Sequence, residues 1–148
     1  MGLSRLYYPD RRGNNLRTFT VNKYLTDEEK EFLGTEIAGI MASFPTINCN
    51  DCKYCMPCPY GVDIPGIFKH YNECVNEGEI AQSTEQENYR KLRRAYLVSY
   101  DRAIPSVRQA NHCIGCKQCI EHCPQSISIP RELRRIEAYV EKLKRNTL

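Results

Sequence analysis

The chain has 148 residues, of which 41% are hydrophobic and 26% charged, a balance typical of a folded globular protein and not of a disordered one. The length allows one domain of ordinary size and excludes a complete (β/α)₈ barrel, which needs about 250 residues. The first twenty residues hold four arginines but no apolar run long enough for a signal peptide, and no later stretch could span a bilayer, so we expect a cytoplasmic protein that does not contact the membrane.

Residues 1–25 are the first segment, which we expect to be a polar arm or connector because it shows no sustained helical period. A capping box from Thr26 to Glu29 then predicts the start of a helix that ends before Pro45. The apolar residues of this helix recur at helical spacing, which predicts one face packed against the core, formed by Leu33, Ile37, Ile40, Met41 and Phe44.

Residues 26–148 are expected to form one mainly α-helical domain with almost no strand. Three more helices are predicted: one over 65–78, opened by a proline; one from a second capping box at Thr84 to about residue 100; and one opened by Pro130. The residues expected to face the core from these helices are Ile67, Phe68, Tyr71, Val75, Tyr89, Leu92, Tyr96, Leu97, Leu133, Ile136, Val140 and Leu143.

Nine cysteines indicate metal binding. Their number is odd and the chain has no secretory signal, so a disulfide framework explains them poorly. Cys74, on the second predicted helix, is expected to be a small buried hydrophobic residue and not a ligand. The other eight form two runs, which are Cys49, Cys52, Cys55 and Cys58, and Cys113, Cys116, Cys119 and Cys123.

The second run has the spacing C-x₂-C-x₂-C-x₃-C-P, which is typical of bacterial ferredoxins. Three closely spaced thiolates in such a run bind one 4Fe-4S cluster, and the fourth thiolate binds a second cluster. Zinc is the alternative, because Cys₄ zinc sites also use C-x₂-C pairs, although they usually take two separated pairs. The runs therefore predict two 4Fe-4S clusters in a helical ferredoxin-like fold.

An internal repeat relates the two runs. Residues 58–65 and 123–130 share the pattern C-P-x-x-[VI]-[DS]-I-P, and the first three cysteines of each run also match, which predicts a pseudo-twofold repeat. If the halves cross, one cluster is held by Cys49, Cys52, Cys55 and Cys123, and the other by Cys113, Cys116, Cys119 and Cys58. One alternative stays open, because the spacing before Cys58 is one residue shorter than before Cys123. In that alternative the first triplet is Cys52, Cys55 and Cys58.

Residues beside the runs are expected to exclude water from the clusters, namely Tyr54, Tyr60, Ile114, Ile120 and Ile127. We interpret the histidines, His70, His112 and His122, as surface residues or neighbours of ligands; a role in proton coupling is the alternative. No catalytic residue is assigned.

Two basic runs lie on predicted helices: Arg90, Lys91, Arg93 and Arg94, and Arg131, Arg134 and Arg135. We interpret them as solvated helix faces, with the docking of an acidic redox partner as a second use. The formal charge of +3 belongs to the chain without metal. Two bound clusters would bring the charge to about −1, so we expect no nucleic-acid partner.

Three segments together, 52–65, 113–125 and 129–133, resemble the C-terminal ferredoxin-type domain of bacterial aldo/keto reductases. The resemblance covers roughly residues 18–145, because the residues before the first predicted helix resemble the connector that follows the barrel in those proteins. It implies two cubane clusters and, as covalent or separate partner, a nicotinamide-dependent reductase barrel. The chain itself lacks that barrel with its catalytic residues, and it carries no glycine-rich dinucleotide fingerprint.

The leading hypothesis from the sequence is an electron-transfer module that serves such a reductase or another redox partner protein. Two alternatives remain. The chain could be a subunit or fragment of a nicotinamide-dependent carbonyl reductase, or the clusters could serve only to stabilise a small domain.

Anaerobic reconstitution should load about eight iron and eight acid-labile sulfide per chain, which is what two cubanes require. Iron and sulfide assays with metal analysis check this. A chain that binds two zinc ions tightly and takes up no iron would contradict it.

Overall fold

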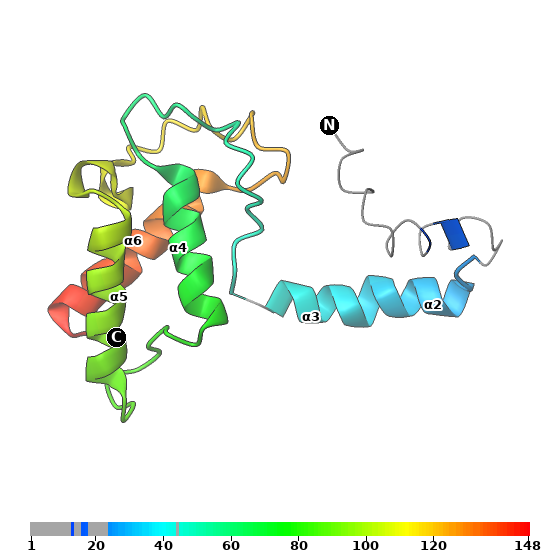
Figure 1. Ribbon diagram of the computed structural model, residues 1–148, viewed down its shortest axis with the longest axis horizontal. Coiled ribbons are helices and arrows are strands. Elements are labelled where there is room, and N and C mark those ends of the chain that lie inside the picture. The colour runs from blue at the N-terminus through cyan, green and yellow to red at the C-terminus, as the bar shows by residue number, and fades with distance from the viewer. Residues whose placement is uncertain (1–12, 14–15, 18–23, 44) are drawn as a thin grey trace. The chain divides into compact units, whose positions relative to one another are not determined.

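The computed structural model describes residues 13, 16–17, 24–43 and 45–148. The chain divides into two compact units, Met1–Phe44 and Pro45–Leu148, and each is described here by itself. Helices and turns make up the described residues, which include no strand, and this confirms the mainly helical fold class (Figure 1). The arm expected at 1–25 lies almost entirely outside the described residues, and the domain boundary expected after it stays a prediction.

In residues 24–43 of the first unit, the structure describes a helix with a π-helical turn in its middle. It consists of α2 (Asp27–Phe32), the π-helical turn η2 (Leu33–Ile37) and α3 (Ala38–Ser43). The capping box is confirmed, because the Glu29 N–H donates to the Thr26 hydroxyl at 3.2 Å and the Thr26 N–H donates to the Glu29 carboxylate at 2.8 Å.

The expectation that this helix packs an apolar face into the core is wrong. Phe32 is 54% exposed and Leu33 45%, and no residue of α2 or η2 is buried among those described. The helix belongs to a different unit from the cluster of buried core residues. Phe44 and the Met41 side chain lie outside the described part of the chain.

The second unit is built on three helices that pack against one another, α4 (Ile64–Asn76), α5 (Tyr89–Ala103) and α6 (Ile129–Arg145) (Figure 1). As predicted, Pro65 and Pro130 stand in the first turns of α4 and α6, where no backbone N–H is needed. None of the helices in the described ranges has the length and apolar character to cross a membrane. The core residues buried on these helices include Ile67, Phe68, Tyr71, Tyr89, Leu92, Tyr96, Leu133, Ile136, Val140 and Leu143, all as expected.

The third predicted helix begins later than expected. The capping box at Thr84 does not form, and α5 begins at Tyr89 after a pair of turns. In these turns the Ser83 hydroxyl accepts from the Glu85 N–H at 3.2 Å, and the Gln86 side chain accepts from the Gln82 N–H at 3.3 Å. Local side-chain bonds of this kind compete with helix formation, and they prevail over the capping pattern here.

An aromatic cluster occupies the middle of this unit. The Tyr96 ring lies 5.1 Å from the His70 ring and 5.0 Å from the Tyr139 ring, edge-on to both. His70 is thus buried and not a surface histidine, and burial lowers its pKa. The Tyr139 hydroxyl accepts from the Ala81 N–H at 2.9 Å and donates to the Ala81 carbonyl at 3.2 Å, whereas the buried Tyr96 hydroxyl has no hydrogen-bond partner among the described residues.

The two tyrosines should therefore respond differently to loss of the hydroxyl. Tyr139→Phe should lower the free energy of unfolding by about 1–2 kcal/mol, because it leaves two backbone groups of Ala81 without their partner. Tyr96→Phe should change it by less than about 0.5 kcal/mol or raise it slightly, because the hydroxyl that it removes is unsatisfied. Urea unfolding followed by circular dichroism measures both, and equal losses would contradict the hydrogen-bond assignment.

Candidate functional site

Two cysteine loops, 45–63 and 113–128, lie together at one end of the three core helices (Figure 1). Their backbones repeat each other. Asp51 and Gly115 have positive φ, 55° and 77°, two residues after the first cysteine of each run. Lys53 and Lys117 have positive φ, 64° and 66°, directly after the second. Because positive φ is uncommon outside glycine, its recurrence at matched positions means that both loops wind in the same way around their first three cysteines.

The match continues at the fourth cysteine after the one-residue difference in spacing. Gly61 and Ser126 both have positive φ, 75° and 52°, three residues after Cys58 and Cys123. The Gly61 N–H donates to the Cys58 carbonyl at 3.0 Å, and the Ser126 N–H donates to the Cys123 carbonyl at 3.1 Å. Cys58 is therefore the structural counterpart of Cys123. The extra residue of the second run is accommodated between Cys119 and Cys123.

Each loop is tied to a core helix just before its first cysteine. Asn72, on α4, accepts from the Ile47 N–H at 2.8 Å and donates to the Ile47 carbonyl at 2.7 Å, two residues before Cys49. In the other loop the Ala110 N–H donates to the Tyr100 hydroxyl at 3.2 Å, three residues before Cys113. Sequence reasoning missed both anchors, and the only signal available was a polar group, the Asn72 amide or the Tyr100 hydroxyl, on a helix of the core.

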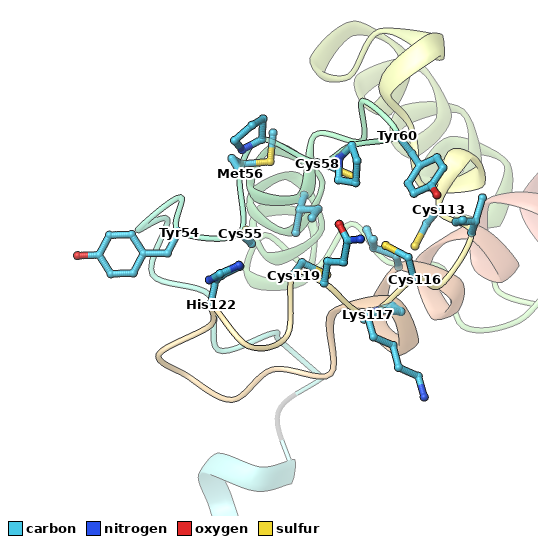
Figure 2. Close-up of a pocket in the computed structure, with 17 residues that line it drawn as sticks. Tyr54, Cys55, Met56, Cys58, Tyr60, Cys113, Cys116, Lys117, Cys119 and His122 are labelled. Atoms are coloured by element: carbon cyan, nitrogen blue, oxygen red, sulfur yellow. The ribbon is translucent and has the colours of Figure 1, made fainter.

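The first cavity is an open pocket of about 290 Å³ between the two loops (Figure 2). Five cysteines line it, two from the first run and the first three of the second, namely Cys55, Cys58, Cys113, Cys116 and Cys119. Ile64 and Leu133, both almost fully buried, line it from the starts of α4 and α6. The cavity therefore brings five thiols from two distant parts of the sequence onto an apolar floor.

The second cavity is smaller and is lined by the complementary set, Cys49, Cys52, Cys55 and Cys123. Its remaining walls are largely apolar and buried, and they include Phe68, Ile127 and Ile129. The enclosed volume is about 20 Å³, room for about one water molecule, so a cubane there requires the four thiols to spread outward. Cys55 lines both cavities, which places the two sites side by side.

The residues expected to exclude water do so only in part. Ile127 is buried in the second cavity, as predicted. Tyr54 is 68% exposed and Ile114 64% exposed, and Figure 2 shows Tyr54 pointing away from the cysteines. These side chains sit on the loops themselves, whereas the buried apolar side chains of the cavities come from the helix starts, among them Ile64 and Ile129.

Burial and crowding of thiols oppose ionisation at these cysteines. Burial, together with the neighbouring Cys113 and Cys116, raises the pKa of the Cys119 thiol to about 11. Burial likewise raises the pKa of Cys49 and of Cys55, and repulsion from the other cysteines of the second cavity adds to it. Thiolates crowded in this way need a positive centre between them, which iron supplies.

The arrangement of donors fits an iron–sulfur cluster. Among the residues that the structure describes, no three His, Cys, Asp or Glu side chains converge on one point closely enough to hold a single metal ion. A zinc ion needs its four donors about 2.1–2.3 Å from one centre, whereas a cubane is bound at four separate corners. Thiols that surround a cavity suit the second geometry.

The remaining cysteine and histidines lie apart from this arrangement or at its edge. Cys74 is buried on α4 and lines neither cavity, which agrees with the expected small buried residue, and burial raises the pKa of its thiol to about 11. His112 is exposed and lies 3.1 Å from the Ser106 carbonyl. His122 is also exposed and lines the first cavity.

Comparison with protein families supplies the assignment. The profile of the 4Fe-4S dicluster domain matches residues 48–128, a span that covers more than half of the chain and holds every cysteine of both cavities. The chain belongs to this family. Two 4Fe-4S clusters are the cofactors of a dicluster domain, which decides against zinc, and electron transfer is the activity that the family indicates. Comparison with curated proteins and with solved structures finds no match.

Proposed function

We propose that this dicluster domain is an electron-transfer module for an oxidoreductase of the aldo/keto reductase type. The observation that carries the proposal is the pair of adjoining cavities, each lined by cysteines from both halves of the chain. When bound, the two clusters supply neighbouring one-electron centres. The protein's own contribution is to hold the thiols, to keep the sites adjacent and to cover them with apolar side chains.

We propose the crossed ligation for these clusters. Cys123 would complete the site of Cys49, Cys52 and Cys55, and Cys58 would complete the site of Cys113, Cys116 and Cys119. Two observations support it: the membership of each cavity, and the matched backbone that makes Cys58 the counterpart of Cys123. Both count against a triplet that begins at Cys52, because that triplet would be out of register with the backbone repeat.

The same arrangement supports transfer between the two sites within the chain. Cys55 lines both cavities, and it is one of the groups whose negative charge raises the pKa of Cys119 across the boundary. The two residues occupy equivalent places, as the third cysteine of each run. Thiols this close would give two ligated clusters a short separation, so that two electrons could pass in single steps.

The partner follows from the resemblance seen in the sequence. A reductase barrel, covalent or separate, would supply the nicotinamide site and the carbonyl chemistry, because the chain carries no dinucleotide fingerprint of its own. We place this function in the cytoplasm, where thiols stay reduced and available to iron.

Paired cysteine variants test the crossed ligation. Cys49→Ala with Cys123→Ala removes two thiols from one site, so the chain should keep one intact cluster and about four irons. Cys49→Ala with Cys58→Ala removes one thiol from each site and should leave no intact four-iron cluster. Iron analysis and electron paramagnetic resonance of the reconstituted variants distinguish the pairs. The opposite ranking would mean that each run binds its own cluster.

Reversible reduction tests the electron-transfer role. Reduction of the anaerobically reconstituted chain should take up about two electrons, one per cluster, and reoxidation should restore the visible spectrum with circular dichroism unchanged. Clusters that break down and unfold the chain on reduction would show a purely structural role. Oxidation of a nicotinamide with a carbonyl acceptor by the isolated chain, without an added partner, would show instead that the chain is catalytic.

A further inference from the structure

An open groove of about 1030 Å³ runs along α5 on a face that contains none of the ligand cysteines. One wall comes from His70 and Glu73 on α4, and the rest comes from the outer face of α5. The two sides meet where the His70 Nε2 lies 2.8 Å from the hydroxyl of Ser99 on α5. The groove is therefore a valley between two packed helices, separate from the iron–sulfur site.

The groove is strongly cationic. Arg90, Lys91, Arg94 and Arg102 line it, and all four are exposed. Its one acidic residue, Glu73, already has a neighbour of opposite charge in Lys69 at 3.8 Å. Among the described residues, none of these three arginines has an ion-pair partner. The surface thus presents positive charge that the unit itself does not neutralise.

Other basic residues of the same sequence runs are used within the fold. Arg93 donates to the carbonyls of Leu143 and Lys144 at the end of α6, and so stabilises a helix C-terminus. Arg135 donates to the Tyr71 hydroxyl at 2.6 Å and to the Glu132 carboxylate at 2.7 Å. In the part of the chain that the structure describes, Arg90, Lys91 and Arg94 make no side-chain hydrogen bond or ion pair of this kind. Some basic residues of the runs therefore stabilise the fold, whereas these three have no assigned role.

The position of the unassigned charges opposes helix stability. Arg90 and Lys91 stand in the first turn of α5, which has no acidic residue. Positive side chains there meet the positive end of the helix dipole. In α2, by contrast, the first turn holds three acidic residues, and in α6 the last turn holds basic residues, whereas α4 has neither at its ends. A cost of this kind is typical of residues that serve binding.

The shape of the cationic surface favours a protein ligand over a nucleic acid. Arg90, Arg94 and Arg102 are spaced by four and eight residues and so lie in one row along about 18 Å of helix. Val98, 41% exposed, interrupts that row and adds an apolar contact. No tyrosine or phenylalanine lines the groove, so bases would have nothing on which to stack.

We infer that this groove is the docking site for an acidic amphipathic helix on the redox partner protein. Carboxylates of that helix would pair with the arginine row, and its apolar residues would cover Val98. A valley between two helices is the surface onto which a third helix packs, and arginine beside apolar side chains is typical of such interfaces. That the partner is a redox protein rests on the proposed function, but binding itself does not require the clusters to change oxidation state.

A pair of labelled peptides tests the inference. One is an acidic helical peptide of about 18 residues with leucines on one face, and the other has the same composition in scrambled order. Fluorescence anisotropy with the reconstituted full chain at low salt should show that the ordered peptide binds about tenfold more tightly. Arg90→Glu with Arg94→Glu should weaken that binding by at least about tenfold.

The matched control is Arg131→Glu with Arg134→Glu, which makes the same charge change at exposed positions of α6. It should leave binding within about twofold. A second variant, Val98→Ser, keeps every charge and should weaken the ordered peptide but not the scrambled one. The visible spectrum and circular dichroism establish that each variant keeps its clusters and its fold.

Four outcomes would overturn the inference. Equal binding of the two peptides would show that the groove attracts anions without recognising a helix. An equal loss of peptide binding in the control variant would show the same. Tighter binding of a uridine oligonucleotide of about 18 nucleotides, lost in the Arg90 and Arg94 variant, would point to nucleic acid. A wild-type dimer that this variant dissociates in sedimentation would point to a second copy of the chain. Each readout is independent of cluster reduction, so failure here and failure of the proposed function are distinguishable.

Discussion

Burial of two isoleucines, Ile64 and Ile129, fixes the cysteine loops to the helical core. Each is almost fully buried at the start of its helix, six residues after the fourth cysteine of its run, and each is followed by a proline. Burying a side chain of this size is worth about 1.5–3 kcal/mol, and the proline sets the backbone for the first helical turn. Ile64 also lines both cavities, so one buried side chain contributes to the position of all the cysteines around it.

Hydrogen bonds from the helices then determine where each loop begins. The Asn72 side chain pairs with both backbone groups of Ile47, and the Tyr100 hydroxyl accepts from the Ala110 N–H. The first loop is therefore held by α4 at both ends, and the second is held by α5 before its first cysteine and by α6 after its fourth. A loop fixed at both ends gives its thiols little freedom, which is how a small helical unit can hold several thiolates around one centre.

Helix α5 divides its two faces between separate tasks. The inward face carries Tyr89, Tyr96 and Tyr100, which are buried, whereas the outward face carries the arginine row of the groove. Because the same helix also supplies the Tyr100 anchor beside Cys113, binding in the groove and the geometry of one cysteine loop depend on one rigid element. The contact surface and the redox site can thus be separate in space without being mechanically independent.

The sequence by itself determined what depends on local chemistry: the two cysteine runs, the C-P-x-x-[VI]-[DS]-I-P repeat, the prolines that open α4 and α6, and the capping box at Thr26. Predictions from the sequence failed where other interactions compete with the local pattern. The capping pattern at Thr84 lost to side-chain turns, and the apolar pattern of the first helix buries no residue of α2 or η2. Only the tertiary structure decided which distant cysteines share a cavity, which arginine caps a helix, and which ones line an open groove. These outcomes depend on contacts between residues far apart in the chain, and no local pattern encodes such contacts.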